Sequence, residues 1–216
     1  MNHKPKGKMK TLEKNRIAKH TNGNGKAASV KVDVQLPKMN IRHIEITIIG
    51  DSSLICHAWS EKAETMMLEK QMQKAKTERP AKNPEQDFQD SLYHLPNGKH
   101  GFPAVAFKSA AVDACSHVHG VTKVEARGAF HIVGDMIEIS GTPTIRQDMV
   151  RVGMGAADIR FRGEFRQWEC KLTIRYNEGV LSAEEIVNLF NVGGFAIGVG
   201  EWRPQCNGSF GMFHVK

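Results

Sequence analysis

Arginine is concentrated in one segment of the sequence, in a pattern that suits the binding of phosphate groups. Five of the chain's 11 arginines lie within residues 141–167, which also hold several glycines. These are Arg146, Arg151, Arg160, Arg162 and Arg166. A guanidinium group can bind phosphate through two parallel hydrogen bonds. We therefore predict that residues 141–167 form a projecting arm with an anionic partner. The alternative is a solvated hairpin whose charge is balanced by Asp148, Asp158 and Glu164.

A glycine-rich stretch near the C-terminus carries an aromatic and a cationic side chain. Gly198 and Gly200 are followed at once by Trp202 and Arg203. Glycine lets a phosphate or a ribose approach the backbone closely, tryptophan stacks on a base, and arginine binds phosphate. This combination predicts a site for a single-stranded nucleic acid. The alternative is that the glycines only form tight turns and Trp202 packs against Pro204.

Lys108 is a further candidate for a phosphate contact. It is the only cation of a helix that we expect within residues 102–118, and the other residues near it are small or apolar. Close to a helix N-terminus, the helix dipole and the ammonium group both attract an anion. The alternative is that the long side chain only reaches out to solvent.

The sequence carries weaker signals for catalysis and for metal binding. A histidine such as His57 or His100 can act as a general acid or base in a metal-independent ribonuclease. His117 and His119 have no spacing of the H-E-x-x-H kind that marks a metal site. We therefore predict no catalytic residues, no metal site and no cofactor.

Positive charge is concentrated at the N-terminus. Residues 1–38 hold ten lysines and arginines against two acidic residues, a balance of +8, so the other 178 residues carry a net −1 of the chain's +7. We interpret residues 1–38 as a basic flexible arm that can hold a polyanion through counterion release. The alternative is a solubilising tail.

Hydrophobic periodicity predicts the elements that position these residues in a domain over 39–216. Isoleucines alternate with polar residues from Ile41, and Ser182 and Glu185 form the pattern of a helix-starting capping box. We expect helices over 59–79, within 102–118 and from Ser182 to Gly193-Gly194, and strands over 41–50, 121–133, 136–140, 168–176, 195–199 and 210–215. Residues 50–101 are interpreted as an insertion on the fold.

The order of these elements indicates an α+β protein. Strand, helix, strand, strand, helix, strand is the ferredoxin-like (RRM-like) βαββαβ core, in which both helices cover one face of an antiparallel sheet. The other face stays open, as in many RNA-binding domains. Four widely spaced cysteines indicate a reducing, cytoplasmic setting. No apolar run is long enough to predict a helix that crosses a membrane, so we expect no membrane partner.

Two segments resemble conserved segments of the RAMP superfamily, which includes backbone subunits and processing endoribonucleases of CRISPR effector complexes. Residues 101–110, GFPAVAFKSA, look like its "IPGSSLKGALR" segment, and residues 193–215 are similar to its closing glycine-rich motif. The C-terminal half also resembles uncharacterised tailed-bacteriophage proteins with a "GVGEWRP…GxFG" ending. The RAMP resemblance implies that residues 141–167 are a thumb that presses against RNA and a neighbouring subunit.

These observations favour a non-catalytic protein that binds RNA or single-stranded DNA and forms a homo-oligomer or filament along it. One alternative is a metal-independent endoribonuclease of the same fold. Another is a phage structural or assembly protein that binds other subunits through the methionine-rich helix expected at 59–79.

Overall fold

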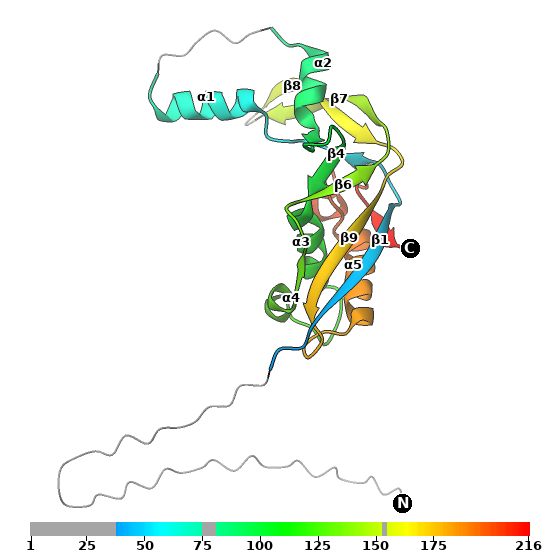
Figure 1. Cartoon of the computed structure of the whole chain (residues 1–216). Helices are drawn as coiled ribbons and strands as arrows, with labels where there is room; N and C mark the ends of the chain where they lie inside the picture. The colour runs from blue at the N-terminus through cyan, green and yellow to red at the C-terminus, as the bar shows by residue number, and fades with distance from the viewer. Residues whose placement is uncertain (1–37, 75–80, 153–154) are drawn as a thin grey trace, which may run out of the picture. The chain divides into compact units, whose positions relative to one another are not determined.

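The computed structural model describes residues 38–74, 81–152 and 155–216 (Figure 1). Lys38–Lys216 form one compact unit, and Met1–Pro37 belong to another. The basic arm predicted over residues 1–38 therefore lies outside the described residues, except for Lys38.

A seven-stranded antiparallel sheet forms the centre of the compact unit. Its strands follow the order β10-β1-β9-β6-β4-β3, and β5 also pairs with β9. They are β1 (Ile41–Gly50), β3 (Tyr93–His94), β4 (His100–Pro103), β5 (Phe130–Ile132), β6 (Met136–Ser140), β9 (Glu169–Asn177) and β10 (Phe213–Val215). The strand predicted over 41–50 is confirmed. Its buried Ile46 and Ile48 face the core because side chains alternate along a strand.

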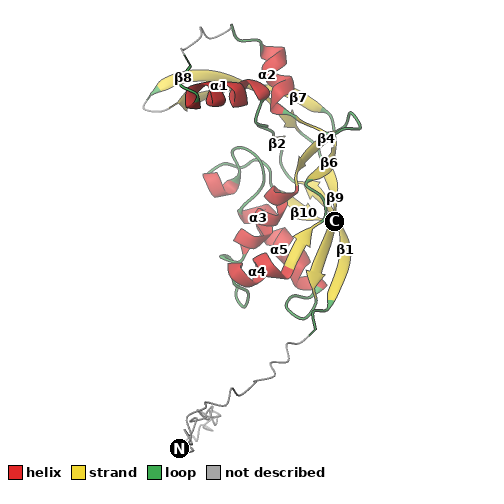
Figure 2. Ribbon diagram, turned by 60° about the vertical axis from the view of Figure 1, so that its left-hand side comes forward, coloured by secondary structure: helices red, strands yellow, loops and turns green. Residues whose placement is uncertain are grey.

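Two helices, α3 (Ala104–Ala114) and α5 (Ala183–Ala196), pack against each other on one face of this sheet (Figure 2). They approach closely, because a Cβ atom added to Gly193 would lie 2.7 Å from the carbonyl oxygen of Ala110. Buried aromatic rings fill the core, among them Phe107, Phe130, Phe190 and Phe213. The close packing fixes the end of α5, from which the glycine-rich stretch continues.

Capping boxes begin both α5 and a shorter helix, α4 (Lys123–Ala129). The predicted box at Ser182 is confirmed: its hydroxyl accepts a hydrogen bond from the Glu185 amide at 3.2 Å, and the Glu185 carboxylate accepts one from the Ser182 amide at 2.8 Å. Thr122 and Glu125 form the same pair of bonds. The strand predicted over 121–133 is therefore wrong over 123–129, because this second box starts a helix there.

Helix α5 continues through the two glycines at which it was predicted to stop. A Cβ atom on Gly194 would lie 1.9 Å from the carbonyl oxygen of Phe213, so this glycine serves the contact between α5 and β10. The Ile197 amide still donates to the Gly193 carbonyl oxygen at 3.0 Å. The strand predicted over 195–199 is thus wrong, and the chain leaves the helix at Gly198.

A second, three-stranded sheet has the order β2-β8-β7. It consists of β2 (Leu54–Ile55), β7 (Pro143–Val152) and β8 (Ala156–Phe165). Strands β7 and β8 form a hairpin within the segment predicted to be an arm. Helix α2 (Pro84–Ser91) packs on β8, where the Gly163 amide donates to the Ser91 hydroxyl at 2.7 Å. The helix predicted over 59–79 is α1 (Glu61–Gln71), and residues 75–80 lie outside the described residues.

The predicted α+β class is confirmed. The sheet contains the pairing order β10-β1-β9-β6 with α3 and α5 on one face, and the short strands β3, β4 and β5 extend it. The ferredoxin-like assignment stays a prediction. Among the described residues, no helix has the length and hydropathy that a membrane crossing requires.

The face of the sheet opposite α3 and α5 carries mostly polar and charged side chains on its two central strands, with Ile41 and Ile49 near the ends of β1. Exposed Glu45 on β1 lies opposite Thr173 on β9, and exposed His43 lies opposite Arg175. Tyr176 of β9 is buried. RNA-binding sheets of the RRM kind stack bases on aromatic residues. Within the described parts of β1 and β9 this face presents no phenylalanine, tyrosine or tryptophan. These two strands therefore offer no aromatic ring on which a base could stack.

Candidate nucleic-acid interface

The loop Gly198–Arg203 is held in place by backbone contacts that only glycine permits. Gly198 and Gly200 have φ angles of 70° and 79°, in the left-handed region that side chains rarely adopt. A Cβ atom on Gly200 would lie 2.6 Å from the carbonyl oxygen of Ile55 on β2. The same oxygen accepts a hydrogen bond from the Glu201 amide at 3.1 Å. The loop is therefore fastened to β2, as the glycine pattern indicated for a tight turn.

Trp202 and Arg203 lie at the outer part of this loop. Trp202 has a φ angle of 55° and the residue is 43% exposed, while its carbonyl oxygen accepts a hydrogen bond from the Phe210 amide at 3.1 Å. The Arg203 guanidinium donates to the Gly200 carbonyl oxygen at 3.1 Å and to Gln205 Oε1 at 3.2 Å. The structure thus presents an indole to solvent on a fixed backbone, with a guanidinium next to it.

A groove of about 220 Å³ separates this loop from helix α3. It is lined on the loop side by residues 197–200 and Arg203, and on the helix side by Ser109 and Asp113 among others. Asp113 is paired with Lys123 at 2.7 Å and with Gln205 at 3.1 Å. This pairing leaves Arg203 as the cation of the groove.

Two of the predicted arginines tie the β7–β8 hairpin to the loop. Arg162 is only 4% exposed in its side chain, and its guanidinium lies 3.3 Å from Asp148 and 3.6 Å from Glu201. Arg146 bonds the other oxygen of Asp148 at 2.9 Å, and its guanidinium lies 4.7 Å from the centre of the Phe210 ring. Both cations therefore join the hairpin to the glycine-rich stretch, and Arg162 does not reach solvent.

The other predicted arginines lie farther along the hairpin. Arg151 is exposed on β7, and Arg160 lies 3.8 Å from Asp158 on β8. Arg166 follows β8, is 76% exposed and lies 3.8 Å from Glu164. Arg151 and Arg166 are thus the arginines of this segment that are open to solvent.

Lys108 has partners within the fold. Its ammonium donates to the Arg127 carbonyl oxygen at 3.2 Å, at the C-terminal end of α4, and lies 3.0 Å from His131 Nδ1 and 5.9 Å from the centre of the Phe130 ring. Burial lowers the pKa of the Lys108 ammonium. The structure therefore places Lys108 apart from the groove, as a residue that joins α3 to α4 and β5.

Glu201 is a residue of this site that the sequence analysis did not identify. Its carboxylate lies 3.5 Å from His57 Nδ1 and 3.6 Å from Arg162, so it connects three separate segments. The partners of Glu201 are distant from it in sequence, and the same is true of Phe210, whose partner is Arg146. The adjacent GEWRP residues gave a signal for the loop but none for these partners.

The charge of Glu201 makes stability depend on pH. Its pKa is lowered from 4.5, first by the hydrogen bond from His57 and then by the charges of Arg162, His57 and Arg203. A lowered pKa in the folded state means that this contribution is present above the unfolded value of 4.5 and is lost as the pH falls through the folded value. We expect the free energy of unfolding to decrease below about pH 4.5, and Glu201→Gln to reduce this slope.

Urea unfolding of the two proteins at a series of pH values measures this effect. Glu64→Gln on the exposed surface of α1 is the matched control and should keep the wild-type slope. Equal slopes for wild type and Glu201→Gln would contradict the assignment.

A second cleft, of about 590 Å³, lies between α1, α2 and the edge of β8. Its lining includes His57, Ser60 and Lys82, together with residues 157–162 of β8. His100, the other histidine considered for catalysis, packs against the Phe165 ring, and burial lowers its pKa. Within residues 38–74, 81–152 and 155–216, no group of three or more histidine, cysteine, aspartate or glutamate side chains is arranged to hold a metal ion.

No protein-family model matches this sequence, and no curated protein matches it. Its fold does resemble solved structures. A chain of the cryo-EM structure of the Type III-B Cmr-beta bound to cognate target RNA superposes with a TM-score of 0.51 at 10% identity, over 82% of this chain and 59% of that chain. This chain thus matches less than two thirds of that subunit's length.

Two further matches are weaker. Cmr6 from Pyrococcus furiosus gives a TM-score of 0.45 at 10% identity, over 83% of this chain and 100% of the other. A chain of a CRISPR RNA-guided surveillance complex gives 0.34 at 10% identity, over 80% and 66%. The fold of this protein is therefore similar to that of a Cmr-beta chain.

Proposed function

We propose that this chain is a non-catalytic protein of the RAMP type that binds RNA or single-stranded DNA and multimerises along it. The observation that carries the proposal is the loop Gly198–Arg203, whose backbone is fixed by glycines and which holds a partly exposed Trp202 next in sequence to Arg203, a residue that lines a groove. The fold likeness to a chain in an RNA-bound complex supports the same function.

In this proposal, the predicted residues divide into two groups. Trp202 stacks on a base, Arg203 binds a phosphate at the groove, and exposed Arg151 and Arg166, with partly exposed Arg160, hold the strand along the hairpin. The remaining residues, Arg146, Arg162 and Lys108, position the hairpin and the helices through their contacts within the fold. The basic residues of the N-terminal segment add affinity that does not depend on sequence.

Replacing Trp202 is the most direct test of base stacking. We expect Trp202→Ala to weaken the binding of a single-stranded oligonucleotide by about 1–3 kcal/mol, roughly 5- to 150-fold, since stacking on one aromatic side chain contributes that much. Fluorescence anisotropy with a labelled strand of roughly 30 nucleotides measures the change.

Trp59→Ala is the matched control for this measurement. Trp59 is an indole that is 67% exposed just before α1, outside the loop. Its removal should leave the affinity within about a factor of two. Equal losses for both variants, or no binding by the wild type at low salt, would contradict the proposed site.

Salt dependence separates the two contributions to binding. The logarithm of the binding constant should fall linearly with the logarithm of salt concentration. This is expected because lysines and arginines that bind phosphates displace the counterions held by the nucleic acid. Deleting residues 1–37 should make this slope less steep, while the loss caused by Trp202→Ala persists. A slope near zero for the full chain would argue against binding to the phosphate backbone.

One observation favours a second function, a metal-independent endoribonuclease. His57 lines the larger cleft, and the Glu201 carboxylate lies at 3.5 Å from its Nδ1 atom, as a carboxylate that orients a general base would. Incubating labelled RNA with the protein in EDTA tests this function. Cleavage that His57→Ala abolishes would support it, and intact RNA would argue against it for that substrate.

A further inference from the structure

The larger cleft contains the free edge of strand β8. Strand β2 pairs with β8 only at Phe165 and Glu164, and β7 occupies the opposite edge over the full length of β8. The last bond on the β2 side runs from the Cys56 amide to the Gly163 carbonyl oxygen, at 2.8 Å. Beyond this point, in the described part of the chain, no strand pairs with that edge of β8. Residues of both α1 and α2 line the cleft, and Figure 1 shows both helices near β8.

Backbone groups of β8 point into this cleft. The Gly163 amide donates to Ser91 and its carbonyl oxygen accepts from Cys56, so both groups point away from β7. In an antiparallel ladder the same direction recurs at every second residue, which places the groups of Phe161, Ile159 and Ala157 on the cleft side. Lys82 donates to the Ile159 carbonyl oxygen from that side. An edge of this kind is a template for another strand.

The two walls of the cleft differ in chemistry. The wall formed by α1 and the residues before it contributes the apolar side chains of Ala58, Ala63 and Met66, together with the polar His57 and Ser60. The wall formed by α2 and the residues before it contributes the charged side chains of Lys82, Asp87 and Asp90. A strand placed between these walls therefore needs one apolar face and one charged face.

The N-terminal segment of this protein contains a run with those properties. Residues 30–36, VKVDVQL, place Val30, Val32, Val34 and Leu36 on one face of a strand, and Lys31 and Asp33 on the other. The valines match the apolar wall. Lys31 offers a charge complementary to Asp87 or Asp90, whereas Lys82 is already paired with Asp158 of β8.

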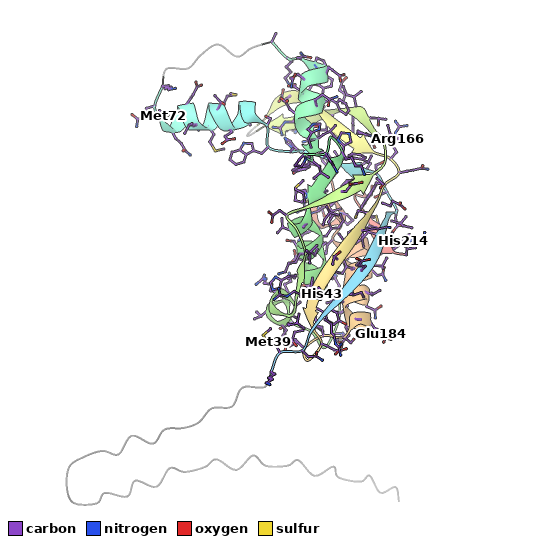
Figure 3. All side chains as sticks on the ribbon, in the orientation of Figure 1. Met39, His43, Met72, Arg166, Glu184 and His214 are labelled. Carbon is purple, nitrogen blue, oxygen red and sulfur yellow. The ribbon has the colours of Figure 1, made fainter. Side chains whose placement is uncertain are left out.

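The run cannot reach the cleft of its own chain. Strand β1 begins at Ile41 and its ten residues span about 33 Å, and the cleft lies beyond its Gly50 end, next to β2. In Figure 3, Met39, just before β1, and Met72, just after α1, lie at opposite ends of the compact unit. The five-residue step from Leu36 to Ile41 spans at most about 18 Å, and even Val30 would need full extension, with no residues left to pair.

We propose that residues 30–36 of one copy add as a strand to the β8 edge of a second copy, between α1 and α2. This inference rests on the multimerisation in the proposed function and supplies its interface. The contact is head-to-tail, since each copy offers one donor segment and one acceptor edge. It therefore generates an open chain or a ring of copies rather than a closed two-fold dimer.

Sedimentation of the nuclease-treated full-length protein tests the proposal. The wild type should form oligomers whose size increases with protein concentration. Val32→Pro should be monomeric, because proline removes a backbone donor and interrupts a strand. The matched control, Asn22→Pro, lies in the same segment outside the run and should behave as the wild type. A monomeric wild type, or oligomers that Val32→Pro leaves unchanged, would overturn the proposal.

A mixing experiment identifies the acceptor edge. Phe161→Pro removes a backbone N–H that points into the cleft and leaves the pairing with β7 intact, so this variant alone should be monomeric. A mixture with Val32→Pro contains one intact donor and one intact edge and should form dimers without longer species. If Phe161→Pro loses its fold, Ala63→Glu in the apolar wall replaces it in the mixture, and a mixture that stays monomeric overturns the proposal.

Failure of this interface can be told apart from failure of nucleic-acid binding. Val32→Pro should still bind a short oligonucleotide of about ten nucleotides with near wild-type affinity, because the loop Gly198–Arg203 is unchanged. Oligonucleotide binding without self-association overturns only the strand exchange. Self-association without binding overturns only the proposed function.

Discussion

Gly194→Ala should lower the free energy of unfolding by about 3 kcal/mol or more. A Cβ atom at this position would lie 1.9 Å from the carbonyl oxygen of Phe213, which is backbone of β10 and cannot rotate away. Helix α5 would have to move from the sheet, and the core contacts of buried Phe190 and Phe213 would loosen. Chemical denaturation followed by circular dichroism measures this loss.

Gly128→Ala is the matched control. Gly128 lies within helix α4, and a Cβ atom there would meet nothing within 4 Å. Alanine favours a helix over glycine by about 1 kcal/mol, so this variant should be as stable as the wild type or slightly more stable. Similar losses for the two variants would contradict the packing of α5 against β10.

Arg162→Ala should lower the free energy of unfolding by about 3 kcal/mol, because it removes one partner of a buried ion pair. The guanidinium lies between Asp148 and Glu201, and Asp148 is also largely buried. Without Arg162, these carboxylates lose a shared cation, and the hairpin loses its connection to the loop. We expect oligonucleotide affinity to decrease as well, under conditions in which the variant is still folded.

Arg166→Ala provides the comparison. Arg166 follows the same strand but is 76% exposed and lies 3.8 Å from Glu164, so its removal should change stability by no more than about 0.5 kcal/mol. Because it faces solvent, its removal should instead weaken binding and reduce the salt dependence. If Arg162→Ala is as stable as Arg166→Ala, the ion-pair network does not hold the hairpin.

Local patterns predicted much of the fold. The isoleucine alternation of Ile41–Gly50 gave β1 because one side of this central strand is buried against the helices. The start of α5 followed from its capping box, which depends on residues three apart. Both patterns depend only on residues close together in the chain, so they can be recognised in the sequence alone.

Features decided by distant contacts were not predictable in the same way. Gly193 and Gly194 have the pattern of a helix end, yet they lie inside α5 because Ala110 and Phe213 come too close for a side chain. The second capping box, at Thr122 and Glu125, is a local pattern that the prediction of a strand over 121–133 did not take into account.

The candidate site was predicted in part. The loop with Trp202 and Arg203 was recognised from its composition, and the structure leaves the indole open to solvent. The role of the arginines in residues 141–167 could not be assigned, because only the fold shows that Arg162 is buried beside Glu201 whereas Arg151 is exposed. The central strands of the open sheet face, which the sequence analysis favoured as a track, carry no aromatic side chain there among the described residues.

The most direct test of the proposed function is photo-crosslinking to a single-stranded RNA of roughly 30 nucleotides that contains 4-thiouridine, followed by mass spectrometry of the linked peptides. We predict that crosslinked peptides contain Trp202. Crosslinks that map to the open face of β1 and β9, or to the N-terminal segment alone, would contradict a binding site at the loop Gly198–Arg203.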